Sequence, residues 1–291
     1  MYRAFLFLST KESHMILERP ILARIGEETV RILREQYYQN KSGQTVYLDE
    51  LVDKAVKGTT LYAPGELLNL QKPIITKTGF PTIEITNETT SAAGKRLLNT
   101  SQEVVVLNFA SAKHPGGGFL SGARAQEEDL TRKSGLYPCL KTQNKYYTSN
   151  KNCKSCLYTD HLIYSPEVPF FRDEDLELLE EPYLLSVITS PAPNAGEELQ
   201  KNPNTEKKIQ TVLDSRSRDV LLAAKQHGHR NLVLGAWGCG VFKNNPKDVA
   251  RYFLKNLKHP WLNGAFDRVV FAIYEFTTEK TLTKTFQEVF R

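Results

Sequence analysis

Cysteine and long apolar runs are both scarce in this sequence, and each absence narrows the class of protein. A membrane-spanning helix needs about 20 consecutive apolar residues, whereas the run Phe5–Leu8 is too short even for the core of a secretory signal. The four cysteines are scattered, which is typical of thiols in a reducing compartment. We therefore expect an intracellular protein without membrane contact, in the cytoplasm, or in the nucleus if the source is eukaryotic.

The cysteines also bear on metal binding. Cys153 and Cys156 form a CxxC pair, the only spacing in the chain that suits a metal. A structural zinc site needs a second pair of ligands at suitable spacing, and the sequence offers none. We expect two loop thiols here, no metal and no cofactor.

The net charge is modest, at +5, and it is spread along the chain, with a lysine-rich stretch at Lys141–Lys154. This charge is compatible with a phosphate-rich ligand. Because the chain has no basic arm and no recognised nucleic-acid module, we do not expect sequence-specific nucleic-acid binding.

The first hundred residues are predicted to be mostly helical, since apolar residues recur at helical spacing. The predicted helices are Ile21–Tyr38, Leu48–Val56 and Ser91–Leu98. Thr90 or Ser91 is the expected N-cap of the third helix. The segment Pro73–Thr86 carries β-branched residues between prolines and is expected to be extended.

From Val104 onward, short apolar runs alternate with helical stretches such as Glu206–His227 and Pro246–Leu257. The runs typical of buried strands are Val104–Asn108, Leu184–Thr189, Leu232–Gly235 and Val269–Tyr274. This order predicts a mainly parallel or mixed sheet covered on both faces. Ligands bind outside the carboxyl ends of strands in such sheets. The candidate site loops are therefore Asn108–Gly118, Ser190–Asn194 and Gly235–Phe242.

The first of these loops leads into the residues best suited to chemistry. Gly116–Gly118 lack every Cβ, so a ligand can approach the backbone, and the N–H groups can converge on an anion. Gln126–Glu128 follow after seven residues, at the start of a predicted helix. Adjacent carboxylates on a helix point about 100° apart, so we expect one to reach a leaving oxygen and the other to hold a hydroxyl. Taken singly, the triple glycine is typical of a flexible loop, and the Gln-Glu-Glu run is typical of a solvated helix face.

Together, GGG and QEE after a strand ending in Asn108 resemble the signature of poly(ADP-ribose) glycohydrolases, most closely the compact microbial branch. Further motifs agree in order: SGLYPCL at Ser134–Leu140, LYTDHLIYSPEVPFFRD at Leu157–Asp173, TSPAPNAG at Thr189–Gly196 and LGAWGCGVFKNNP at Leu234–Pro246. The resemblance covers most of Gln102–Tyr274. The first hundred residues are also similar to that branch's leading segment.

The resemblance implies an α/β macrodomain-like fold, a three-layer sandwich with a mixed central sheet and an ADP-ribose cleft at the strand ends. We expect residues 1–100 to form a mostly helical accessory segment packed on the core, and residues 101–291 to form the catalytic domain. The implied enzyme is a glycosidase that cleaves the ribose–ribose O-glycosidic bond of poly(ADP-ribose). Its expected partners are the polymer or another ADP-ribosylated substrate, with ADP-ribose as product, and we expect a monomer.

The family's site residues can be transferred to matching positions. The resemblance implies that Glu128 is the catalytic acid and base and that Glu127 holds a ribose hydroxyl. The residues expected to contact ligand are Asn108, Gly116, Gly117, Gly118, Gln126, Asn194, Gly238, Cys239, Gly240, Val241 and Phe242. Phe242 suits an apolar wall for a ribose or a place in the core, and Cys239 is expected to serve by its small size, without acting as a nucleophile.

Two positions depart from the animal enzymes of the family. Asn108 stands where they carry an aspartate, and Ser111 where they carry an asparagine. An amide still binds a ribose hydroxyl but does not ionise.

In the expected mechanism, Glu128 is kept protonated by burial or by Glu127 and gives its proton to the leaving ribose oxygen. It then takes a proton from the attacking water. Two alternatives stay open. A mono(ADP-ribosyl) hydrolase would use the same cleft and acid, whereas a non-catalytic ADP-ribose reader would have no need of an acid there.

Overall fold

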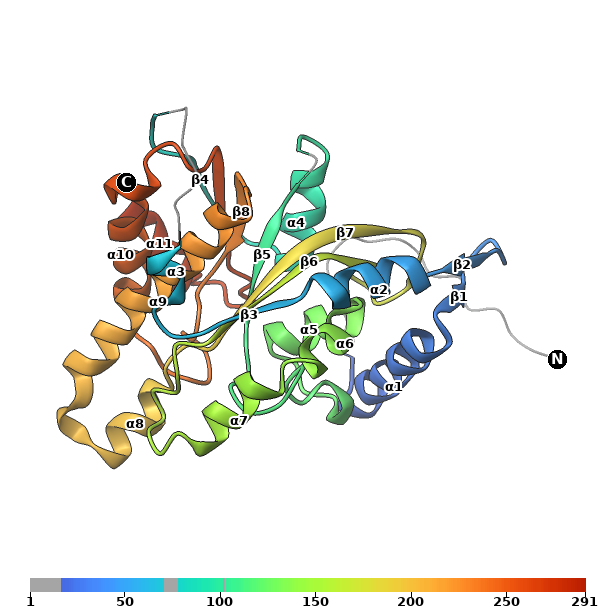
Figure 1. The fold of residues 1–291 in the computed structure, drawn as a ribbon, viewed down its shortest axis with the longest axis horizontal. Helices are drawn as coiled ribbons and strands as arrows, with labels where there is room; N and C mark the ends of the chain where they lie inside the picture. Colours follow the sequence, from blue (N-terminus) through green and yellow to red (C-terminus); the bar gives the residue numbers. More distant parts are fainter. Residues whose placement is uncertain (1–16, 71–77, 102) are drawn as a thin grey trace.

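The centre of the protein is a seven-stranded sheet, shown in Figure 1. The computed structural model describes residues 17–70, 78–101 and 103–291. The strand order is β3-β6-β7-β5-β8-β9-β4. The strands are β3 (Thr60–Tyr62), β4 (Thr82–Thr86), β5 (Val105–Phe109), β6 (Leu162–Arg172), β7 (Leu178–Ser190), β8 (Asn231–Leu234) and β9 (Arg268–Ala272). Neighbours from β7 to β4 pair in parallel, while β6 is antiparallel to both β7 and β3. The predicted mixed sheet is confirmed.

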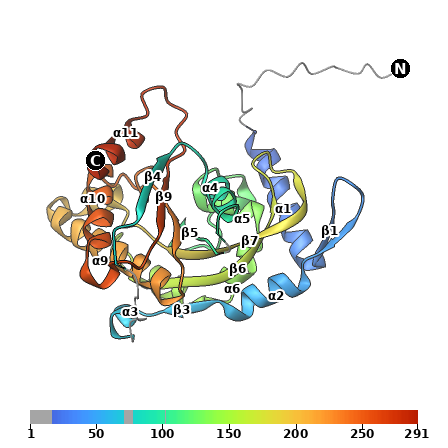
Figure 2. The same cartoon turned by 90° about the horizontal axis from the view of Figure 1, so that it is seen from above.

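Helices cover both faces of this sheet. They are α1 (Arg19–Glu35), α2 (Asp49–Gly58), α3 (Glu66–Asn69), α4 (Thr90–Leu98), α5 (Gln126–Lys133), α6 (Leu136–Lys141), α7 (Asn144–Asn152), α8 (Ala195–Lys201), α9 (Glu206–Gln226), α10 (Pro246–Leu257) and α11 (Thr281–Phe290). Figure 2 shows α9, α10 and α11 on one side of the sheet and α4 and α5 on the other. The three-layer, macrodomain-like sandwich is therefore confirmed.

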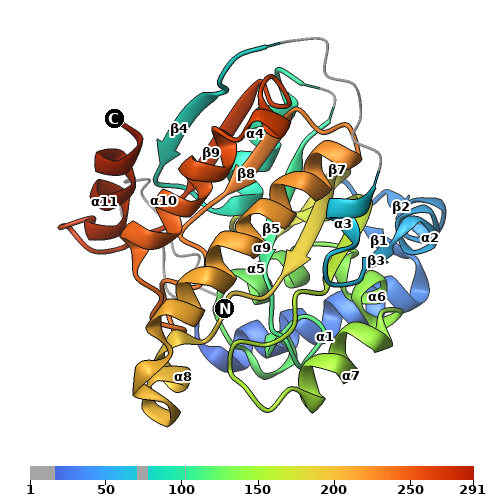
Figure 3. The ribbon, with the colours of Figure 1, turned by 60° about the vertical axis from the view of Figure 1, so that its left-hand side comes forward.

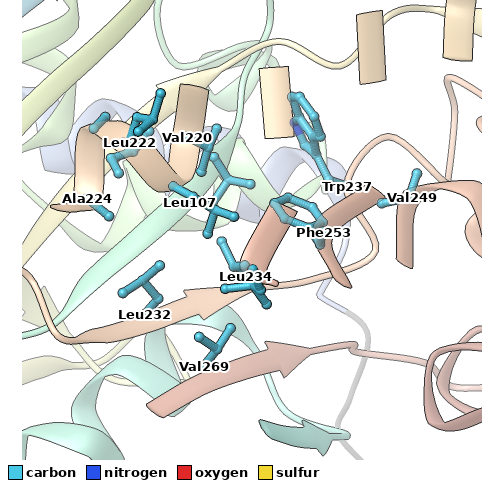
Figure 4. Packing of buried hydrophobic residues seen from close by; sticks show 14 of the residues in the cluster. Leu107, Val220, Leu222, Ala224, Leu232, Leu234, Trp237, Val249, Phe253 and Val269 are labelled. Carbon is cyan, nitrogen blue, oxygen red and sulfur yellow. The ribbon is translucent and has the colours of Figure 1, made fainter. Parts of the chain in front are cut away.

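The apolar strand runs explain why both faces are covered. Successive side chains of a strand point to opposite faces, so Val105 and Leu107 of β5 enter one core while Val106 enters the other. Figure 4 shows the first core, where Leu107 and residues of β8 and β9 meet α9 and α10. A strand buried on both sides needs a continuous apolar run, which is what the sequence displays.

Several predicted boundaries were wrong by a few residues. The helix expected over Ile21–Tyr38 ends at Glu35, because Gln36 adopts a left-handed conformation (φ 65°). The chain then forms a two-stranded hairpin, β1 (Tyr37–Gln39) with β2 (Thr45–Tyr47). The N-cap of α4 is Thr89, whose side chain accepts a hydrogen bond from the Ala92 amide.

The first hundred residues also contain strands of the large sheet, namely β3, which was not predicted, and β4, which lies in the segment expected to be extended. β3 and β4 form the two edges of the large sheet, so this segment contributes to the core sheet as well as packing on it. The expected extended segment Pro73–Thr86 lies partly outside the described residues, and its last five residues form β4. The division at residues 100 and 101 stays a prediction.

The long β6–β7 hairpin is the largest element that the sequence analysis missed. β7 extends over 13 residues, of which only Leu184–Thr189 were predicted as a strand. β6 was not predicted, because Pro166 and Pro169 interrupt its apolar run.

Among the described helices, none combines the length and apolar character needed to cross a bilayer.

Candidate active site

The three predicted site loops begin at one edge of the sheet. β5 pairs in parallel with β7 on one side and with β8 on the other. Their carboxyl ends therefore lie together, and the loops that follow them, near Ala110, Pro191 and Gly235, start from the same edge. This is the place where open α/β sheets bind ligands.

Glu127, in the first turn of α5, is almost fully buried at 2% exposure. Both of its carboxyl oxygens accept hydrogen bonds, Oε2 from the Ser111 amide at 2.6 Å and Oε1 from the Asn108 side-chain amide at 3.2 Å. Burial raises the pKa of Glu127 to about 8; the two hydrogen bonds oppose this rise, and the negative charge of Glu128 adds to it. The Glu127 carboxyl group thus retains its proton at neutral pH.

Glu128 is also buried, but its carboxyl group has different hydrogen-bond partners. Its side chain is 8% exposed, and Oε1 accepts a hydrogen bond from the Gly118 amide at 2.8 Å. Within the described residues, the buried oxygen Oε2 has no hydrogen-bond partner. A buried polar atom without a partner is costly, and a ligand hydroxyl would satisfy this one. Glu128 therefore lies against the first glycine turn, in the loop region that follows β5, and its contact with a ligand stays a prediction.

The triple glycine brings the backbone up against both carboxylates. Gly116 and Gly117 have positive φ angles of 70° and 58°, a conformation that favours glycine. A Cβ on Gly117 would lie 2.9 Å from Cδ of Glu128, closer still to its Oε1, and 3.0 Å from Oε2 of Glu127. The sequence predicted close approach of a ligand at this turn, and the structure shows that the two catalytic candidates approach it.

The second glycine turn follows β8. Gly238 has φ 70°, and the buried side-chain amide of Asn244 holds the turn by donating to the carbonyls of Gly238 at 3.0 Å and Pro193 at 2.8 Å. Gly240 is open, since a Cβ there would meet nothing within 4 Å. Burial raises the pKa of the Cys239 thiol to about 12, which agrees with a residue that is not a nucleophile.

Of the other predicted ligand residues in these loops, one is exposed to solvent and two contact other parts of the protein. Val241 is 83% exposed, and the Phe242 ring lies 6.1 Å from the Tyr158 ring. The Asn194 side chain caps α8 by accepting from the Glu197 amide. Their contact with a ligand stays a prediction.

Gln126 and Asn108 connect α5 to the end of β5. The Gln126 side chain accepts from the Phe109 amide at 2.8 Å and donates to the Leu107 carbonyl at 2.7 Å. Asn108 is fully buried and donates to Thr189 as well as to Glu127. In the protein without ligand, both side chains therefore position the glutamate-bearing helix.

Three buried side chains that the sequence analysis did not select also shape these loops. Besides Asn244, Trp237 donates from Nε1 to the Ser190 carbonyl at 3.1 Å. Arg216 of α9 donates to the Pro191 carbonyl and pairs with Asp160. A buried arginine is invisible in a helical pattern of apolar residues, and no local signal distinguished it.

A cleft of about 430 Å³ opens at the same edge. Phe109, Gln126 and Ala236 connect it to the loops described above, and its other wall carries Tyr274 and Phe276. Those two rings are exposed and lie 4.6 Å apart. The sequence analysis assigned them no role.

The leading helix α1 packs behind this site. The Thr29 hydroxyl donates to the Arg132 carbonyl of α5 at 2.7 Å. A Cβ on Gly26 would lie 2.9 Å from the carbonyl oxygen of Phe119, just after the triple glycine. α1 is thus in close contact with the loop that carries the first glycine turn.

The CxxC pair contacts neighbouring polar groups. Lys201 donates from Nζ to the Cys156 sulfur at 3.0 Å. Among the described residues, no cluster of three histidine, cysteine or acidic side chains suits a metal ion.

Comparisons with known proteins agree with this geometry. A family model for the microbial-type PARG catalytic domain, PARG being poly(ADP-ribose) glycohydrolase, matches residues 26–173. The enzyme structure from Thermomonospora curvata is 44% identical, covers 93% of this chain and 100% of its own, and has a TM-score of 0.87. A structure of that enzyme bound to the inhibitor ADP-HPD is 45% identical, with coverage of 93% and 99% and a TM-score of 0.86.

A structure from Deinococcus radiodurans in complex with ADP-ribose is also similar. It is 43% identical, covers 82% of this chain and 97% of its own, and has a TM-score of 0.76. No curated protein matches the chain.

Proposed function

Since this chain belongs to the microbial-type poly(ADP-ribose) glycohydrolase family, we propose that it hydrolyses the ribose–ribose bond of poly(ADP-ribose) and releases ADP-ribose. One observation supports the role of its own residues most directly. Two buried carboxyl groups, Glu127 and Glu128, lie on one glycine turn at the ligand edge of the sheet. Only one of them keeps an oxygen without a hydrogen-bond partner among the described residues.

This difference assigns the two roles. Glu127, whose oxygens accept hydrogen bonds from Ser111 and Asn108, positions a ribose hydroxyl, and its burial favours the protonated form at neutral pH. Glu128 has Oε2 available, and this atom delivers the proton to the leaving ribose oxygen. Two close carboxyl groups share protons as a pair, so a proton retained by the pair is available to Glu128 when substrate binds.

Proton transfer lets the ribose–ribose bond break toward an oxocarbenium-like transition state. A water molecule then attacks the anomeric carbon, and Glu128 takes up its proton, which restores the starting state. The turn Gly238–Phe242 presents backbone N–H groups to the diphosphate. In the turn Gly116–Gly118, the Gly117 and Gly118 amides already donate to the His114 carbonyl and to Glu128, so this turn holds the catalytic carboxyl group. The bound diphosphate places negative charge near the cationic centre.

The adjoining cleft suits the adenine. An aromatic base stacks on aromatic side chains, and Phe276 and Tyr274 provide exposed rings on one wall. Phe242, whose ring lies 6.1 Å from that of Tyr158, provides an apolar surface for the terminal ribose. Val241, Cys239 and Asn194 complete the proposed set of ligand contacts.

Replacing Glu128 with glutamine tests this proposal. General acid–base catalysis contributes roughly a hundredfold to ten-thousandfold in rate, so E128Q should release ADP-ribose about a thousandfold more slowly. Its affinity for ADP-ribose, measured by calorimetry, should stay within about threefold because the amide keeps the shape of the side chain. Unchanged release by E128Q would refute the role of Glu128.

The same assay separates the two alternatives. A wild-type protein that releases ADP-ribose from singly modified substrates but not from polymer would be a mono(ADP-ribosyl) hydrolase. Tight binding of ADP-ribose without turnover of any substrate would identify a reader.

A further inference from the structure

Basic residues occur along the whole chain, but their excess over acidic residues lies in one segment. Residues 130–159 contain six lysines and arginines and no acidic residue, whereas the rest of the chain has 32 basic and 33 acidic residues. This segment, which includes α6 and α7, therefore accounts for the whole net charge of +5. Such an imbalance produces a local positive field.

Four of the six basic side chains face solvent. Lys133 and Arg132 are buried, while Lys141, Lys145, Lys151 and Lys154 are exposed. Within the described residues, none of these four ammonium groups forms an ion pair. We call these four lysines the α6–α7 basic surface.

Two lysines of the α6–α7 basic surface, Lys145 and Lys151, lie on α7 itself. The buried residues of α7 are Tyr146, Tyr147 and Asn150. At about 100° per residue, the exposed Lys145 falls opposite the centre of this buried arc, and the exposed Lys151 falls on its flank, beside Tyr147. The packing of the two tyrosines thus leaves both lysines in solvent.

The inner side of the same helices contacts the catalytic region. The Tyr137 ring of α6 packs edge-on against Phe119, directly after the triple glycine, at 5.0 Å. Tyr146 and Tyr147 of α7 belong to the same buried apolar cluster as Leu130 of α5, so α7 packs in the layer that holds the glutamate-bearing helix. Figure 3 shows α7 at the end of the sheet toward which β7 points.

We propose that the α6–α7 basic surface binds the diphosphates of the polymer units beyond the one that is cleaved. This inference rests on the proposed function. Each unit of the substrate carries a diphosphate, and a chain attached to the leaving oxygen at Glu128 has to pass over the neighbouring surface. Lysines that neutralise phosphates release counterions, which makes binding stronger at low salt.

Four lysine-to-glutamine replacements test the proposal. K141Q/K145Q/K151Q/K154Q is compared with K54Q/K57Q/K255Q/K258Q, which removes the same charge from exposed positions on α2 and at the end of α10. Both sets are made with Glu128→Gln as common background so that the probe stays intact. The probes are labelled long-chain poly(ADP-ribose) and single ADP-ribose, and the measurement is binding at two salt concentrations.

The α6–α7 variant should bind long polymer at least tenfold more weakly at low salt, with a smaller difference at high salt. Its affinity for ADP-ribose should stay within twofold, and the control variant should match its parent with both probes. Equal polymer binding by the two variants would overturn the proposal. A parallel loss of ADP-ribose binding would also overturn it, since the lysines would then act through the cleft.

A nucleic acid is the competing partner for a basic surface. Single-stranded RNA of equal phosphate number that competes as well as unlabelled polymer would contradict the proposal, because a surface aligned with Glu128 should favour the chain that enters its site. Failure of the wild-type protein to release ADP-ribose from polymer would refute the proposed function, and it is measured by turnover, independently of these binding results.

Discussion

The contact between the glycine turn and the two glutamates makes Gly117→Ala an informative change. At φ 58°, an alanine is strained by roughly 1–2 kcal/mol. Its Cβ would also lie 2.9 Å from Cδ of Glu128 and 3.0 Å from Oε2 of Glu127. Both distances are shorter than an ordinary van der Waals contact, so both carboxyl groups have to move.

The two consequences differ in size. The obstructing atoms belong to the ends of flexible side chains, so their movement costs little folding free energy. Catalysis is more sensitive, because a displacement of about 1 Å can reduce a rate by roughly a hundredfold. We therefore expect G117A to lose about a hundredfold in kcat/KM while its free energy of unfolding falls only by the backbone strain.

Gly43→Ala is the matched control, since Gly43 has φ 78° in the β1–β2 hairpin and open space around its Cβ position. Urea unfolding should show a similar loss of stability for G43A and G117A, whereas ADP-ribose release from polymer should fall only for G117A. Turnover of G117A within threefold of the wild type would refute the idea that this turn positions the catalytic pair.

Two further predictions concern pH. The pKa of Glu127 is raised from 4.5 to about 8 by burial, so its contribution to stability is present below pH 4.5 and lost as the pH rises to 8. E127Q has no carboxyl group at this position and avoids this loss. The free energy of unfolding of E127Q in urea, relative to that of the wild type, should therefore increase between pH 5 and pH 8, by at most about 5 kcal/mol. A difference that stays constant with pH would contradict the raised pKa of Glu127. Burial lowers the pKa of His227 and His229 to about 4, so folding should weaken as the pH falls from 6.5 to 4, by about 3 kcal/mol for the buried His229. H227Q/H229Q should flatten this part of the unfolding profile, and an unchanged slope would exclude the pair as its cause.

Local sequence patterns were sufficient for the main elements of the fold. The apolar runs around Val105, Leu232 and Val269 predicted central strands because a strand buried on both faces needs apolar residues on both. The alternation with helices then indicated a mixed sheet and its ligand edge. The two chemical motifs, GGG and QEE, were likewise continuous in the chain and could be recognised there.

The antiparallel part of the sheet was harder to predict. β6 contains Pro166 and Pro169, which weaken a strand pattern. β3 is only three residues long, and it joins the sheet by pairing with β6. Short edge strands depend on their neighbours for stability, so their own residues carry little signal.

What the sequence alone determined is therefore the four central strands β5, β7, β8 and β9, the two glycine turns and the presence of adjacent glutamates. Only the tertiary structure decided how those glutamates differ. Asn108 and Ser111 approach Glu127 from the end of β5, while Glu128 is left with one buried oxygen that accepts no hydrogen bond from a described residue. The reason is physical: burial and hydrogen bonds from distant segments set the protonation of a carboxyl group, and these come into being only when the segments pack together.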